Sequence, residues 1–96
     1  MKLRFTTSAQ AEFFAVINYI RQENPMAAQE YFLRAKRVLR RLEQFPESGR
    51  YLPEFPDLPH REIIVRPYRF VYRVMGTTVW VVTVWHGARQ PIRPAS

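Results

Sequence analysis

The sequence predicts an α+β fold in which a helical hairpin packs on one side of a four-stranded sheet. Two runs rich in β-branched and aromatic residues, at 68–74 and 79–84, meet at a turn around Gly76 and predict an antiparallel hairpin. Two apolar stripes with helical spacing come earlier, and a short alternating run precedes both. The expected order is strand-helix-helix-strand-strand-strand, ending in an antiparallel meander.

The first two elements are a short strand and a helix. Residues 2–6 alternate polar and apolar side chains, as a strand does. Thr7 followed by Gln10 has the pattern of a capping box, so Thr7 is the expected N-cap. The helix should end before Asn24-Pro25, because the residue before a proline is disfavoured in the α region. The buried stripe of this helix is expected to comprise Ala9, Phe13, Val16, Ile17 and Ile20.

A second helix should begin at Pro25, with Asn24 as its cap, and run to about Gln44. So short a link predicts an antiparallel helical hairpin. The expected buried stripe consists of Ala28, Tyr31, Phe32, Ala35, Leu39 and Leu42. The opposite face is basic, with Arg34, Arg37 and Arg41 at helical spacing, and it has two interpretations: a solvated surface, or a docking surface for phosphate or carboxylate groups.

A proline-rich connector separates the helices from the last three strands. Its four prolines exclude regular structure over 45–60, while Phe55 and Leu58 should hold it against the domain. Residues 61–66 form the next strand, which Pro67 ends. The tail 90–96 is expected to be extended.

The C-terminal hairpin is expected to have two different faces. In its first strand an aromatic face comprises Tyr68, Phe70, Tyr72 and Val74, and a guanidinium-bearing face comprises Arg69, Val71, Arg73 and Met75. In its second strand the expected faces are Val79, Val81 and Thr83 against Trp80, Val82 and Val84. Because both faces of this second strand are largely apolar, it should lie inside the sheet.

Composition limits the classes of function. The 96 residues form a single domain, 1–96. Without cysteine, neither a disulfide framework nor a thiolate zinc site can form, and no metal site or cofactor is predicted. No apolar run is long enough for a membrane span, so a cytoplasmic protein is expected. The net charge is +7, and only Lys2 and Lys36 among fifteen basic residues are lysine. This bias toward arginine favours an acidic partner or nucleic acid.

One catalytic constellation is conceivable from the residues alone. Cleavage of RNA by general acid-base chemistry needs a titrating group and cations for the phosphate. Arg66, Arg69, His86 and Arg89 lie at strand ends or on one sheet face and are the candidates. His86 is the group among them that titrates near neutral pH. The alternative is that His86 is structural and catalytically idle.

The order of several short motifs resembles the RelE/ParE superfamily of toxins from type II toxin-antitoxin systems. The motifs are Asn-Pro-x-Ala-Ala at 24–28, Pro-x-Ser-Gly-Arg at 46–50, Tyr-Arg-x-x-Tyr-Arg at 68–73 and His-Gly-Ala-Arg at 86–89. The first, second and fourth look specifically like the ParE branch. The resemblance implies a small cytoplasmic toxin that a co-expressed antitoxin neutralises with an acidic or amphipathic segment. It leaves open a homodimer or a heterotetramer with the antitoxin.

The two branches imply different activities. ParE-like members are associated with poisoning DNA gyrase by binding, without catalysis. RelE-like members cut mRNA on the ribosome, using basic residues on the strand before the Tyr-Arg motif; here those positions are Glu62 and Ile64. Arg69 fits the motif arginine, and some RelE-like relatives place a histidine near His86, so the nuclease remains the alternative. A second alternative is a degenerate member that only pairs with its antitoxin.

The sequence therefore favours a non-enzymatic, ParE-like toxin with an arginine-rich binding surface. The residues expected to contact the target or the antitoxin are Arg34, Arg37, Arg41, Arg69, Arg73, Trp85, His86 and Arg89. The antitoxin is expected on a sheet edge or in a helical groove.

Overall fold

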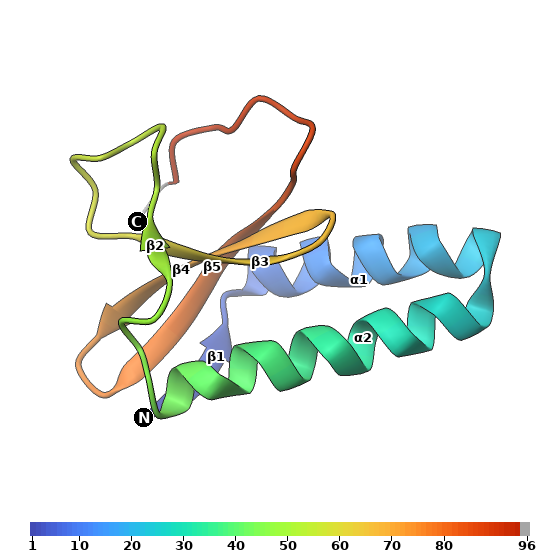
Figure 1. Ribbon diagram of the computed structural model, residues 1–96, viewed down its shortest axis with the longest axis horizontal. Helices are drawn as coiled ribbons and strands as arrows, with labels where there is room; N and C mark the ends of the chain where they lie inside the picture. Colours follow the sequence, from blue (N-terminus) through green and yellow to red (C-terminus); the bar gives the residue numbers. More distant parts are fainter. Residues whose placement is uncertain (95–96) are drawn as a thin grey trace.

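The computed structural model describes residues 1–94 and confirms the α+β architecture (Figure 1). Its elements in chain order are β1 (Lys2–Phe5), α1 (Thr7–Glu23), α2 (Pro25–Arg40), the 3-10 turn η1 (Arg41–Glu43), β2 (Arg50–Tyr51), β3 (Arg61–Val65), β4 (Tyr68–Met75) and β5 (Thr78–His86). The final two positions of the predicted tail lie outside the described residues. Within residues 1–94, neither α1 nor α2 has the length and apolar composition that a membrane span requires.

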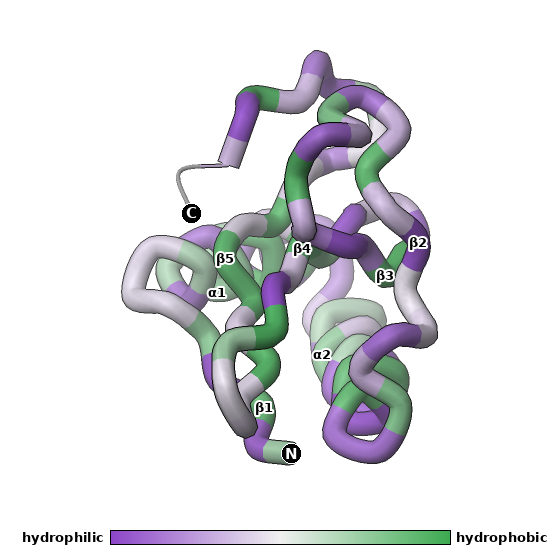
Figure 2. The backbone as a smooth tube through the Cα atoms, turned by 90° about the vertical axis from the view of Figure 1, so that its left-hand side faces the viewer, coloured by the Kyte–Doolittle hydropathy of each residue, from purple (hydrophilic) through white to green (hydrophobic). Residues whose placement is uncertain are grey.

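The sheet has five strands in the order β1-β5-β4-β3-β2, one more than the sequence predicted. The extra strand is β2, in which Arg50 pairs with Glu62 and Tyr51 with Arg61. The prolines of the connector limit β2 to two residues but leave room for this pairing, so the expectation of no regular structure there was wrong. The interior position of β5 is confirmed, because it pairs with β4 antiparallel and with β1 parallel (Figure 2).

The start of α1 corrects the predicted cap. Thr6, not Thr7, is the N-cap, and its Oγ1 accepts a hydrogen bond from the Ala9 N–H at 3.1 Å. The Thr6 N–H donates to the carbonyl of Val81 at 3.0 Å. This last bond beside β1 holds Thr6 in the extended conformation that an N-cap residue needs. The end of the strand therefore decides where the helix begins.

The helical hairpin covers one face of the sheet, as predicted, and its far end projects beyond the strands (Figure 1). Asn24 caps α2 through its side chain, which accepts from the Ala27 N–H at 3.1 Å. Phe13 of α1 lies at the centre of the core, stacked between Phe5 and Phe32 at 5.6 and 5.7 Å and edge-on to Phe70. The predicted stripes of both helices contribute to this core, together with β3, β4 and β5.

The faces of β5 differ from the predicted alternation. The pairing of β4 with β5 shifts by one residue at Val82, which forms a bulge. After a bulge the side chains change sides. Val84 consequently joins Val79 and Val81 in the core, whereas Thr83, predicted to share their face, is only half-buried.

The other face of the sheet, here called the outer face, is covered by the connector 45–60. Val71 of β4 and Leu52 of the connector are both fully buried, yet neither belongs to the main core cluster. Phe55 and Leu58, the expected anchors, are half-buried, so Leu52 is the principal apolar anchor of the connector. This cover restricts access to the side chains that β3 and β4 direct outward.

Gly49 closes the connector against the sheet. The Tyr72 hydroxyl accepts a hydrogen bond from the Gly49 N–H at 3.0 Å and donates to the Pro46 carbonyl at 2.7 Å. A Cβ at Gly49 would lie 2.6 Å from the Glu62 carbonyl oxygen and 2.6 Å from the Tyr72 hydroxyl. The Pro-x-Ser-Gly motif therefore has a steric reason for its glycine.

We expect Gly49→Ala to lower the free energy of unfolding by about 1–3 kcal/mol, because the methyl group overpacks a site bounded by backbone. The midpoint of urea unfolding, compared at equal slope, measures this loss. Ser48→Ala, at the exposed neighbouring position, is the matched control and should leave the midpoint nearly unchanged. Equal midpoints for the two variants would contradict the close approach at Gly49.

Candidate functional site

Arg69, which was predicted both as a binding residue and as a candidate nuclease residue, lies on the outer face in an ionic cluster. Its Nε donates to Glu62 Oε1 at 2.6 Å. Its two terminal nitrogens bind Glu54 in a bidentate pair at 3.0 and 2.7 Å. Arg50 of β2 donates to the second oxygen of Glu62. Two carboxylates and two guanidinium groups thus join β2, β3, β4 and the connector.

The central pair of the cluster is buried, whereas Arg50 and Glu54 at its two ends are partly exposed. Glu62 is 2% exposed and Arg69 is 8% exposed. Hydrogen bonding to Arg69 lowers the pKa of Glu54, and the same bonds, first to Glu54 and then to Glu62, raise the pKa of Arg69. Glu54 and Arg69 therefore stay charged near neutral pH. With these donors engaged, Arg69 is a structural arginine in this state.

Trp85 and Arg73 also lie on the outer face. The guanidinium of Arg69 lies 5.0 Å from the ring centroid of Trp85, at cation-π distance. Phe55 of the connector contacts the same indole ring at 6.4 Å between centroids. Arg73 pairs with Trp80 farther along the hairpin and is half-buried. Trp85 therefore forms part of the contact between connector and sheet.

His86 and Arg89 lie on the helical side, at the end of β5. The ring of His86 meets the ring of Tyr68 edge-on at 5.1 Å. His86 and Arg89 line a hollow of about 550 Å³, here called the β5-end hollow, together with Tyr19 and Tyr68. Glu12 of α1 reaches the same place and accepts bonds from the Thr83 hydroxyl and the Val84 N–H, both at 2.9 Å.

The arginines of α2 divide into two groups. Arg37 and Arg41 line a surface hollow of about 590 Å³ together with Lys36 and Arg40. Arg34 instead turns toward the β3–β4 turn, where it donates to the Arg66 carbonyl at 3.2 Å. Across residues 1–94, none of these basic side chains forms an ion pair with a carboxylate. This surface, Lys36, Arg37, Arg40 and Arg41, is called the α2 basic face below.

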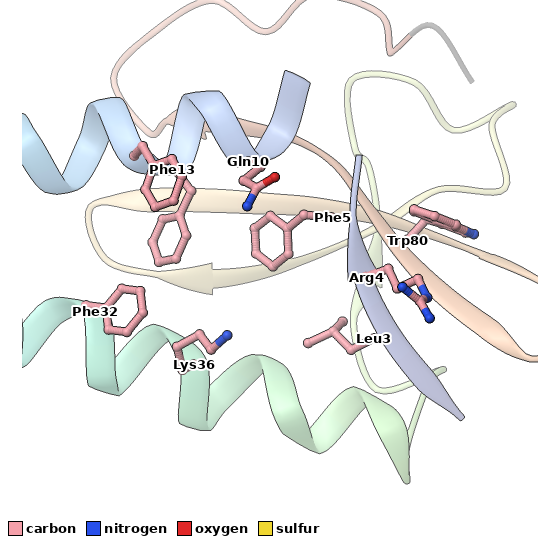
Figure 3. Close-up of a pocket in the computed structure, with 9 residues that line it drawn as sticks. Leu3, Arg4, Phe5, Gln10, Phe13, Phe32, Lys36 and Trp80 are labelled. Carbon is pink, nitrogen blue, oxygen red and sulfur yellow. The ribbon is translucent and has the colours of Figure 1, made fainter. Parts of the chain in front are cut away.

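An apolar groove runs between the two helices and reaches β1. One hollow of about 550 Å³ lies between α1 and α2, and another of about 420 Å³ lies beside β1. Both are lined by Phe14 and Phe32, so they lie next to each other, and together they are called the helical groove here. Figure 3 shows the β1 end of the groove, where Phe5, Phe13 and Phe32 gather between the helices and the strand, and Lys36 reaches in from α2. Phe14 is 55% exposed there.

The structure does not bring the candidate nuclease residues together. Arg69 lies on the outer face, His86 and Arg89 line the β5-end hollow on the helical side, and Arg66 is exposed at the β3–β4 turn. His86 and Arg89 are the two members of the set that share a hollow. The expected surface residues likewise occupy three places: the neighbourhood of α2, the outer face and the end of β5.

Several residues of these sites were missed from the sequence. Glu54 is the second carboxylate of the ionic cluster, and Glu62 was considered only as a replacement for a basic residue of the RelE-like branch. Glu62 and Ile64 lie on the same face of β3, because side chains two residues apart point to the same side of a strand. Arg69 of β4 pairs with Ile64, so a contact between Glu62 and Arg69 could have been expected. No sequence pattern marked Tyr19 or Phe14 as site residues. Both belong to α1, from which Tyr19 lines the β5-end hollow and Phe14 lines the helical groove.

Comparison with known proteins relates the chain to toxins bearing both the ParE and the RelE names. The family model described as "ParE toxin of type II toxin-antitoxin system, parDE" matches residues 3–91. The chain is 36% identical over 86 residues to Toxin RelE2 of Caulobacter vibrioides, covering 88% of this chain and 93% of that protein. It also matches a structure titled "Chromosomal ParDE TA system from P. aeruginosa" with a TM-score of 0.63 and 19% identity, covering 90% of this chain and 95% of that one.

Proposed function

The chain belongs to the ParE toxin family of type II toxin-antitoxin systems, and from this membership we propose that it acts by binding and inhibiting DNA gyrase. The resemblance drawn from the sequence is confirmed at the level of the family. One observation carries the choice of binding over cleavage: the guanidinium of Arg69 is engaged by Glu62 and Glu54, and His86 lies on the other side of the sheet.

This arrangement supports a binding protein because RNA cleavage needs its groups within hydrogen-bond reach of one phosphate. A RelE-like nuclease is expected to have basic residues at two positions of β3. Here those positions are Glu62, which is buried and ion-paired, and Ile64, which is exposed. We therefore assign the outer face to stability.

The target contact is proposed to lie on the α2 basic face. The cations of α2 have no carboxylate partner within the described residues, so an acidic surface could bind them without first breaking ion pairs. Such complementarity raises the association rate and fixes the orientation of a complex. Arg34, Arg73 and Trp85 are already in contact with other parts of the domain and would contribute less.

A supercoiling assay with purified gyrase tests the proposal. We expect saturating toxin to abolish supercoiling, and Arg37→Ala/Arg41→Ala to raise the toxin concentration needed by about tenfold, the effect of losing roughly 1.4 kcal/mol of binding energy. Lys2→Ala/Arg21→Ala removes the same two charges elsewhere and should behave like the parent chain.

Unimpaired gyrase at saturating toxin would count against this function. Primer extension on translated mRNA then distinguishes the nuclease, which would leave cuts at the ribosomal A site. A lack of growth arrest on expression would instead favour a degenerate member that only binds an antitoxin.

The cognate antitoxin is proposed to occupy the helical groove. An amphipathic segment can place apolar side chains against Phe14 and Phe32 while its acidic residues approach Arg4 and Lys36 at the β1 end. The net charge of +7 supports an acidic partner. A short acidic protein encoded in the adjacent reading frame is the expected candidate, and both partners would meet in the cytoplasm.

A further inference from the structure

We propose that the β5-end hollow binds a nucleotide through its phosphate group. The hollow lies between α1, the start of β4 and the turn after β5, and its volume is about 550 Å³. Tyr19, Tyr68, His86 and Arg89 line it, and each can direct a hydrogen-bond donor toward a ligand. A phosphate accepts several such bonds at once.

The turn after β5 fixes the tautomer of His86. The Ala88 N–H donates to His86 Nδ1 at 3.0 Å. Because a backbone amide can only donate, Nδ1 is the unprotonated nitrogen and Nε2 carries the hydrogen. The Arg89 N–H donates to the His86 carbonyl at 3.0 Å, which closes the turn. The turn therefore offers Nε2–H and the Arg89 guanidinium from one short segment.

Tyr68 differs from the other buried tyrosines. Tyr31 donates its hydroxyl hydrogen to the Val65 carbonyl, and Tyr72 donates to the Pro46 carbonyl. Within residues 1–94, no group accepts a hydrogen bond from the Tyr68 hydroxyl, although the residue is buried. Burial raises the pKa of Tyr68, so the hydroxyl stays protonated and available as a donor.

The single acid of the lining does not neutralise these donors. One carboxylate oxygen of Glu12 already accepts from the Thr83 hydroxyl and the Val84 N–H at the open edge of β5. In the described part of the chain, neither His86 nor Arg89 is ion-paired with it. The hollow thus presents mainly donors, which favours an anion.

The walls favour a nucleotide over a lone carboxylate. Tyr19 is 63% exposed and offers a ring face on which a base can stack, while Val16 and Val84 form apolar walls. The volume is in the range of small-molecule sites and would be mostly empty around a single acidic side chain. The phosphate would contact Arg89, His86 and Tyr68, and the base would cover Tyr19.

The nucleotide could be free or part of a single strand, and binding measurements separate these sources. Purified toxin is titrated into fluorescein-labelled dT8 and rU8 in 0.15 M salt, with unlabelled dTMP and AMP as competitors. Displacement by a mononucleotide shows that one nucleotide is sufficient. Binding of the labelled strands without displacement shows that the site needs a strand. Either result supports the proposal.

Four variants of the lining residues and one control variant test the proposal. Arg89→Ala should weaken binding about tenfold or more, by loss of a charge-assisted bond. Tyr19→Ala should weaken it about fivefold or more through lost stacking, while Tyr19→Phe keeps the ring and should bind nearly as the parent does. His86→Asn keeps an acceptor for the Ala88 N–H but lacks Nε2–H, and should lose severalfold. Arg21→Ala is the control: it removes one positive charge on α1, outside the lining of the hollow, and should change the affinity for the nucleotide by less than about twofold.

Three outcomes would overturn the inference. One is no binding of either oligonucleotide or mononucleotide at millimolar toxin. Another is an equal loss in Arg89→Ala and Arg21→Ala, which would indicate unspecific attraction by the net charge. The third is binding of an octaglutamate peptide with no binding of nucleotides, which would assign the hollow to a protein carboxylate. No gyrase is present in these titrations, so their failure is separate from failure of the proposed target.

Discussion

Glu62→Ala is expected to lower the free energy of unfolding by about 3–5 kcal/mol, because it removes one partner from a buried ion pair and leaves the other charged. Arg69 would keep its bidentate pair with Glu54, which places the expected loss toward the lower end of that range. Arg50 would also lose its partner across β2 and β3. Denaturant unfolding measures the loss, since domains of this size are stable by only about 5–15 kcal/mol.

A double replacement and a surface control make this prediction specific. Glu62→Leu/Arg69→Met replaces the buried pair by apolar side chains and should recover much of the loss, because no unpaired charge is then buried. Asp57→Ala breaks the Asp57–Arg93 pair, whose side chains are mostly exposed, and should have little measurable effect. A Glu62→Ala protein as stable as the parent would mean that Arg69 is not held as described.

The ionic cluster also explains a limit of sequence reasoning. The helices and their buried stripes could be predicted because the apolar period of a helix is local, and Gly76 with its positive φ marked the hairpin turn. Glu54 and Arg69 are fifteen residues apart and meet only because the connector folds over the outer face. No periodic pattern records such a contact. The same holds for Phe14, whose exposure depends on what lies beside the helix.

Smaller errors have equally specific causes. The N-cap was placed one residue late because the pattern of Thr7 and Gln10 could not register that Thr6 bonds to β5. The faces of β5 were assigned by strict alternation, which a bulge at Val82 interrupts. The predicted site residues lie on different faces of the sheet for a related reason. Trp85 and His86 are neighbours in the sequence but point to opposite faces, and only the register of β4 against β5 shows that Arg69 shares the face of Trp85.

Phe14→Asp is expected to weaken the complex with the cognate antitoxin by about thirtyfold or more, the effect of losing a hot-spot side chain worth at least roughly 2 kcal/mol. Phe14 lines both hollows of the helical groove and is exposed before any partner binds. The introduced carboxylate would also repel an acidic segment. Calorimetric titration of the antitoxin into purified toxin gives the dissociation constants.

Phe45→Asp is the matched control, because Phe45 is 62% exposed but lies outside the lining of the groove. It should bind the antitoxin as the parent does. Salt separates the two contributions to the parent complex: contacts with Lys36 and Arg4 are screened at 1 M salt, whereas burial of Phe14 and Phe32 is not. A complex released completely by high salt, or one weakened equally by the two substitutions, would place the antitoxin on a charged surface outside the helical groove.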